Sequence, residues 1–282
     1  MSEGVSITSS GRGSLASLRE RALGAAALVP HRLRRWVLVV MIIAIALVAG
    51  FGFDVRGSHR PVLFDRPVDA FLTGASGVGR QAAIVFYHFG DPKIFVSITA
   101  VVAVALVVLG DARAALNTVA SVGLALVVVE QVLKPFFDRR LNHLPGPTFP
   151  SGHAAVAAAL AGAVVLAAGG SRPLGRLLGA PWRGAVMALA IMVPCAVGTA
   201  MVALQLHYMS DVVAGVPLGL AIAGGTALFL DLVADRWRLG IATDRPHILM
   251  ACRETPRARR LSPRRPRVRE TSRVPDVPAG TP

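Results

Sequence analysis

The chain has 282 residues, of which 54% are hydrophobic, and its mean hydropathy is +0.58. The apolar residues come in long blocks, a composition that excludes an ordinary soluble domain and indicates an integral membrane protein. The net charge of +14 comes mainly from arginines outside these blocks. We therefore interpret the charge as a signal of membrane topology.

Six apolar blocks predict six transmembrane helices, because about 20 helical residues cross the hydrocarbon core of a bilayer. The second and fourth blocks are short, so we expect each to gain a turn from its flanks. Two short helices at the membrane surface are expected between the first two blocks. The predicted fold class is an all-α integral membrane protein, a six-transmembrane helix bundle. In chain order the blocks are 36–53, 94–109, 114–132, 154–168, 185–206 and 212–233, and the two surface helices are 68–73 and 80–89.

Three regions follow from this pattern: a basic leader (1–35), a six-span membrane domain (36–235) and a tail rich in arginine and proline (236–282). The leader has no short apolar core followed by a cleavage site, so the first span is expected to be an uncleaved signal anchor. The tail has little apolar surface to bury, which predicts disorder. Its charge suits anionic lipid headgroups, and we expect no nucleic-acid partner.

The distribution of arginine predicts the orientation in the membrane. Both ends are arginine-rich, and so is the connection between the fourth and fifth blocks, which indicates that all three face the cytoplasm. By alternation, the loops 54–93 and 134–153 and the turn around His207 face outward. We therefore expect a multi-pass protein of the plasma membrane. Usage rich in arginine and alanine and poor in lysine suggests a bacterial source with a GC-rich genome.

The first of three polar clusters follows the third block, in the stretch LKPFFDRRLNH. It contains Lys134, one of only two lysines in the chain, and the arginines Arg139 and Arg140. A lysine at the end of a membrane helix often only extends its amine toward the headgroups. This cluster alone leaves both that role and a binding role open.

The second cluster, PSGH, opens the fourth block and contains Ser151, Gly152 and His153. A serine at a helix start predicts an N-cap. The first N–H groups of the helix, with the Gly152 backbone and the Ser151 hydroxyl, would also point at one spot where an anion is stabilised. Capping and phosphate binding are compatible at this position.

The third cluster, LHYMSD, precedes the sixth block and contains His207 and Asp211. On a helix, a spacing of four residues puts both side chains on one face. The carboxylate can then accept a hydrogen bond from one imidazole nitrogen and leave the other free and more basic. Ionisable groups beside a membrane span are costly, so this pair predicts a functional site.

Together, Lys134 with nearby arginines, PSGH and the HxxxD pattern of His207 and Asp211 resemble the type 2 phosphatidic acid phosphatase superfamily. This is a six-helix membrane family whose soluble relatives include the vanadium haloperoxidases. The resemblance covers roughly residues 60–235 and includes the order and spacing of the motifs. It implies a hydrolase acting on a lipid phosphate or a polyprenyl diphosphate.

The resemblance also implies roles for individual residues. His207 is the expected nucleophile, Asp211 orients it, and His153 is the general acid and then the base in a reaction through a phosphohistidine. The phosphoryl oxygens are expected to contact four groups: Lys134, Arg139, Ser151 and the Gly152 backbone. No metal or other cofactor is implied, and the sequence offers no carboxylate cluster to bind one.

Two family arginines are missing. The first motif usually has an arginine seven residues after its lysine, where this chain has Leu141, and the third has one where this chain has Met201. Arg139 is the favoured substitute, and Arg140 is a possible compensating cation. Losing one preorganised donor typically costs about 3–4 kcal/mol of transition-state stabilisation. The alternative to an active phosphatase is therefore a weakened or inactive protein of the same fold that binds lipid phosphates.

Overall fold

The computed structural model describes residues 27–243 except Ala75 and Asn142. Residues 1–26 of the predicted leader and residues 244–282 of the predicted tail lie outside the described residues. The chain divides into two units, Met1–Gly240 and Ile241–Pro282, and the account below concerns the first.

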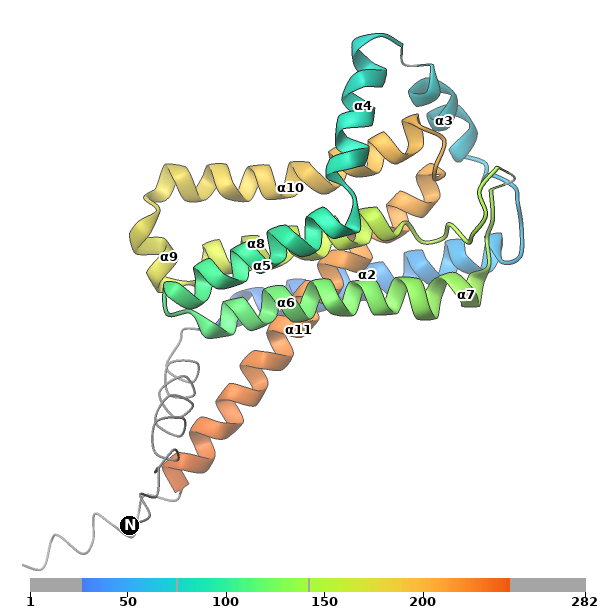
Figure 1. The fold of residues 1–282 in the computed structure, drawn as a ribbon. Helices are drawn as coiled ribbons and strands as arrows, with labels where there is room; N and C mark the ends of the chain where they lie inside the picture. The colour runs from blue at the N-terminus through green and yellow to red at the C-terminus, as the bar shows by residue number, and fades with distance from the viewer. Residues whose placement is uncertain (1–26, 75, 142, 244–282) are drawn as a thin grey trace, which may run out of the picture. The chain divides into compact units, whose positions relative to one another are not determined.

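The described residues are helical (Figure 1) and contain no strand, only an isolated bridge between Arg140 and Pro147. The predicted all-α class is therefore confirmed. The helices are α2 (His31–Val55), α3 (Asp65–Thr73), α4 (Val78–Phe89), α5 (Pro92–Val108), α6 (Ala112–Val127), the π-helical η1 (Val128–Leu133), α7 (Lys134–Phe137), α8 (Gly152–Gly170), α9 (Arg172–Leu177), α10 (Ala180–Ala203) and α11 (Met209–Thr243).

Five described helices are long and apolar enough to cross a membrane: α2, the continuous α6 to α7, α8, α10 and α11. The predicted second span differs, because α5 has only 17 residues. It qualifies only together with α4, from which it is bent by 60°. The bend has a local cause: Asp91 caps α5 with its side chain, and Pro92 occupies the first turn of α5.

Helix α8 lies at the centre of the bundle, against α5, α6 and α10. It consists almost entirely of alanine, glycine, valine and leucine, and 72% of its most apolar window is buried. Small side chains let helix backbones approach closely in a membrane. At Gly219 of α11, an added β-carbon would overlap the carbonyl oxygen of Ala155, and at Gly215 it would lie 2.7 Å from that of Ser151. This contact fixes the start of α11 against the start of α8.

Replacing Gly219 with leucine is expected to destabilise the protein strongly, because the backbone of α8 cannot move aside as a flexible side chain could. Overpacking in cores typically costs about 1–3 kcal/mol or more. The measurement is thermal unfolding of the purified protein in detergent. Gly123→Leu is the matched control, since a β-carbon on Gly123 meets nothing within 4 Å. Equal midpoints for the two variants would contradict the close contact.

Candidate active site

The predicted pair of His207 and Asp211 forms at the junction of α10 and α11. His207 Nδ1 lies 3.2 Å from Asp211 Oδ2. The predicted turn around His207 is present, before α11 begins at Met209, so the two residues do not share one helix face as their spacing would give on a helix. Asp211 lies in the first turn of α11 and also accepts the Tyr208 N–H at 3.1 Å. One carboxylate therefore caps the helix and orients the imidazole.

Arg139 lies behind Asp211 in a fully buried ion-pair network. Its guanidinium donates to Asp211 Oδ1 at 2.6 Å, to Asp65 Oδ2 at 3.1 Å and to the Ser210 hydroxyl at 2.7 Å. It also stacks over the Tyr208 ring at 4.4 Å. Asp65 in turn accepts the Ser210 N–H at 2.7 Å, which ties α3 to the start of α11.

These contacts do not favour the predicted roles of the two arginines in phosphate binding. To contact a phosphate, Arg139 would have to leave two buried carboxylates, which is costly. Arg140, the possible compensating cation, pairs with Asp138 at 2.8 Å and is about half exposed. In the structure, Arg139 supports Asp211, and Arg140 is engaged in the neighbouring loop.

The predicted N-cap of α8 is confirmed. Ser151 Oγ accepts the Ala154 N–H at 3.4 Å. The Ser151 N–H donates to the Asp211 carbonyl at 3.0 Å, so the second and third motifs are joined through their backbones. His153, the second residue of α8, faces His207 with 6.3 Å between ring centroids and 65° between ring planes. Both histidines predicted to be catalytic therefore lie side by side.

Lys134 follows the π-helical turn η1 and is nearly buried. Its amine contacts the carboxylate of Glu130 at 2.7 and 2.9 Å. A β-carbon on Gly152 would overlap Glu130 Oε1 and would lie 3.6 Å from the Lys134 amine. The three polar clusters thus meet at one end of the bundle, as predicted.

Neither position at which the family usually has an arginine carries a cationic side chain in this protein. Met201 is fully buried in the core cluster formed with Phe95, Val156 and Val197. Leu141 is 4% exposed and lines a pocket beside His207. The apolar side chains are therefore integrated into the fold, and the charge of the family arginines is not replaced at their own positions.

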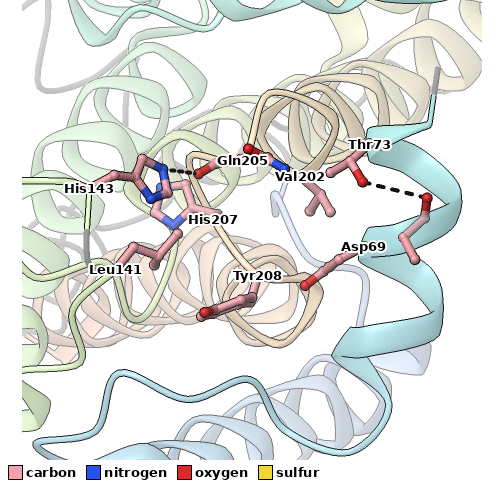
Figure 2. Close-up of a pocket in the computed structure, with 9 residues that line it drawn as sticks. Asp69, Thr73, Leu141, His143, Val202, Gln205, His207 and Tyr208 are labelled. Atoms are coloured by element: carbon pink, nitrogen blue, oxygen red, sulfur yellow. Dashed lines mark hydrogen bonds between the residues drawn. The ribbon is translucent and has the colours of Figure 1, made fainter. Parts of the chain in front are cut away.

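A pocket of about 290 Å³ opens beside His207 (Figure 2). Asp69 and Thr73 of α3 line one part of it, and His143 and Gln205 line another. His143 Nε2 lies 2.7 Å from the Gln205 carbonyl oxygen, and Gln205 has a positive φ of 61°. Lys134 and His153 do not line this pocket, whereas His207 lines it and also faces His153.

Asp69 is the titratable carboxyl of this pocket. Burial, followed by the neighbouring charge of Asp65, raises the pKa of Asp69 from 3.8 to about 6. A raised pKa means that the folded protein holds this proton more tightly than the unfolded chain does. Protonated Asp69 therefore stabilises the folded state fully below about pH 3.8, and this stabilisation is lost as the pH rises through about 6.

As the pH rises from 4.5 to 7, the variant Asp69→Asn is therefore expected to lose less thermal stability than the wild type. Asparagine keeps the oxygen that accepts the Met209 N–H at 3.3 Å, so only the titration is removed. The measurement is the unfolding midpoint in detergent across that range. Parallel pH profiles for the two proteins would contradict the raised pKa.

Several site residues could not be singled out from the sequence. Asp65 and Asp69 appear there only as acids in a loop, and Glu130 as a single charge at the end of an apolar block. His143 did have a signal in the sequence that could have identified it as a site residue, namely its position in the polar stretch after Lys134. Among the described residues, no group of three or more histidine, cysteine, aspartate or glutamate side chains could hold a metal ion. The absence of a cofactor stays a prediction.

The fold and the site define a class: a multi-pass helical membrane protein with two facing histidines where its spans meet. The chain belongs to the PAP2 superfamily, whose family model matches residues 96–234. This range includes all three motifs.

A solved structure has a similar fold. It is described as the crystal structure of the first transmembrane PAP2 type phosphatidylglycerolphosphate phosphatase from Bacillus subtilis. The TM-score is 0.55 at 18% sequence identity, and the similarity covers 68% of this chain and 94% of that one. At this identity the likeness concerns the fold alone. No curated protein matches the sequence.

Proposed function

We propose that the chain is an integral-membrane, metal-independent phosphatase that hydrolyses a lipid phosphate or a polyprenyl diphosphate through a phosphohistidine intermediate. The observation that carries the proposal is the orientation of His207. Asp211 holds Nδ1 at 3.2 Å, which leaves Nε2 as the free nitrogen. His153 faces the same ring and can serve as the proton donor.

The reaction would proceed in two steps. His207 Nε2 attacks phosphorus, the bond to the leaving oxygen breaks, and His153 gives that oxygen a proton. The neutral His153 then takes a proton from water, whose oxygen attacks phosphorus and releases His207 and phosphate. Asp211 stabilises the imidazolium that forms when His207 carries the phosphoryl group, because its carboxylate accepts a hydrogen bond from Nδ1–H.

Lys134, Ser151 and the Gly152 backbone are the proposed ligands of the phosphoryl oxygens. Arg139 is instead assigned a positioning role, because its bonds to Asp211 and Asp65 fix the carboxylate that orients His207. This assignment replaces the contact with phosphate expected from the family pattern.

A lipid substrate is supported by the place of the site in the fold. His153 lies in the first turn of α8, a candidate span, and His207 immediately precedes α11, another candidate span. A substrate with its phosphate at this end can keep its apolar chains among the spans. The arginine distribution supports an outward-facing site in the plasma membrane with both termini in the cytoplasm.

The alternative is a weakened or inactive protein that binds lipid phosphates. The apolar side chains at Leu141 and Met201 favour it, since two transition-state donors are missing. The intact His207 and Asp211 pair favours the enzyme, because binding alone needs no oriented nucleophile.

Phosphate release by the purified protein in detergent, with EDTA present, tests the proposal. The substrates are phosphatidate, phosphatidylglycerophosphate and a polyprenyl diphosphate. We expect release from at least one of them. No release from any, together with binding of the same lipids, would support the alternative.

A further inference from the structure

The carboxylate of Glu130 lies between two groups proposed to bind the substrate's phosphate. It contacts the Lys134 amine at 2.7 and 2.9 Å. It also lies so close to Gly152 that any β-carbon there would overlap Oε1. Gly152 is the first residue of α8, where the unpaired N–H groups of a long helix favour a negative charge. An anion of the chain itself therefore stands against the start of α8.

This position conflicts with the binding of phosphate. Glu130 Oε1 contacts the Lys134 amine at 2.7 Å and lies against Gly152, so a phosphoryl group that touched both groups would come close to this oxygen. Two negative groups would also share one lysine, and like charges at close range repel each other. Arg139 cannot offset this repulsion, since it is bonded to Asp65 and Asp211.

The side chain of Glu130 has room to rotate away from Lys134 and Gly152 toward the surface. It is 42% exposed, whereas Lys134 is only 15% exposed, so the carboxylate can rotate outward while the lysine stays. The backbone here is the π-helical turn η1, an irregularity that often occurs at functional sites. Glu130 and Lys134 therefore pair across this turn at the edge of the site.

We propose that Glu130 is a specificity-determining residue whose carboxylate competes with a phosphate monoester, free or on a lipid, for Lys134 and the start of α8. The proposal rests on the proposed phosphate site and deepens it. Substrate binds by displacing the carboxylate, and the returning carboxylate helps to expel inorganic phosphate after hydrolysis. The wild type should therefore hold free phosphate weakly.

The test is the binding of inorganic phosphate to Glu130→Gln and wild-type protein in detergent, measured by thermal shift. Glutamine keeps the size of the side chain and removes its charge. We expect about tenfold tighter binding in the variant, the size of effect that one nearby charge has at a partly exposed site. Asp235→Asn is the matched control, because Asp235 is a carboxylate of nearly equal exposure, 41%, that pairs with Arg34 far along α11 from the site. It should bind phosphate as the wild type does.

A second arm uses short-chain phosphatidate in place of phosphate. If Glu130→Gln binds both ligands more tightly than the wild type, Glu130 competes with the lipid headgroup and with the product phosphate. If the variant binds only inorganic phosphate more tightly, Glu130 competes with the product alone. Equal affinities of Glu130→Gln and wild type for both ligands would overturn the proposal, as would an equal gain in Asp235→Asn. Phosphate release from lipid substrates is measured separately. Tighter phosphate binding by Glu130→Gln without any release would contradict the proposed phosphatase activity but support the proposed competition by Glu130.

Discussion

Replacing His207 with alanine is expected to reduce phosphate release to the background rate. The imidazole is the only group of the protein that forms a bond to phosphorus in the proposed reaction, so its loss removes both steps. Asp211 would remain buried and bonded to Arg139, which should preserve the fold. The measurement is phosphate release from the best substrate, with the thermal midpoint recorded to show that the variant is folded.

His153→Ala separates the two chemical steps. Loss of the base should slow hydrolysis of the intermediate by about 10²–10⁴-fold, the usual contribution of proton transfer. With a good leaving group, this variant should accumulate an acid-labile phosphoenzyme, which His207→Ala cannot form. His31→Ala is the control, because His31 is an exposed residue at the start of α2. Turnover surviving in His207→Ala would refute the nucleophile.

The helices could be predicted because their causes are local. Apolar length predicted the spans, and a serine before the glycine of PSGH predicted the cap of α8. The order of the spans was enough to bring the three polar clusters to one end. These features depend on neighbours in sequence or on the alternation of direction in the membrane.

The support behind the site could not be predicted, because it depends on contacts between distant residues. Asp65 meets Arg139 across 74 positions and Ser210 across 145. Nothing in the sequence near Asp65 marks it as fully buried. The turn around His207 was expected, but not whether His207 and Asp211 would pair on one helix or across that turn: Gln205, with its positive φ, lies between the end of α10 and the start of α11. The i, i+4 spacing fits both geometries.

Arg139→Ala is expected to destabilise the protein by about 3–5 kcal/mol, because it leaves two buried carboxylates without their cation. For a chain of this size that corresponds to a fall of about 10 °C in the unfolding midpoint. Asp65 and Asp211 would repel each other across the cavity, and the orientation of His207 would be lost with them. Activity should therefore fall together with stability, measured in detergent without substrate.

Arg140→Ala is the matched control, since it removes the neighbouring guanidinium from a half-exposed pair. Exposed pairs contribute only about 0–1 kcal/mol, so its midpoint should stay close to that of the wild type. Arg139→Lys should recover part of the stability, because one ammonium keeps the charge but cannot span both carboxylates as the guanidinium fork does. If Arg139→Ala instead unfolded like the wild type and only raised KM, Arg139 would be a phosphate ligand. The ion-pair network would then not be what holds Asp211 in place.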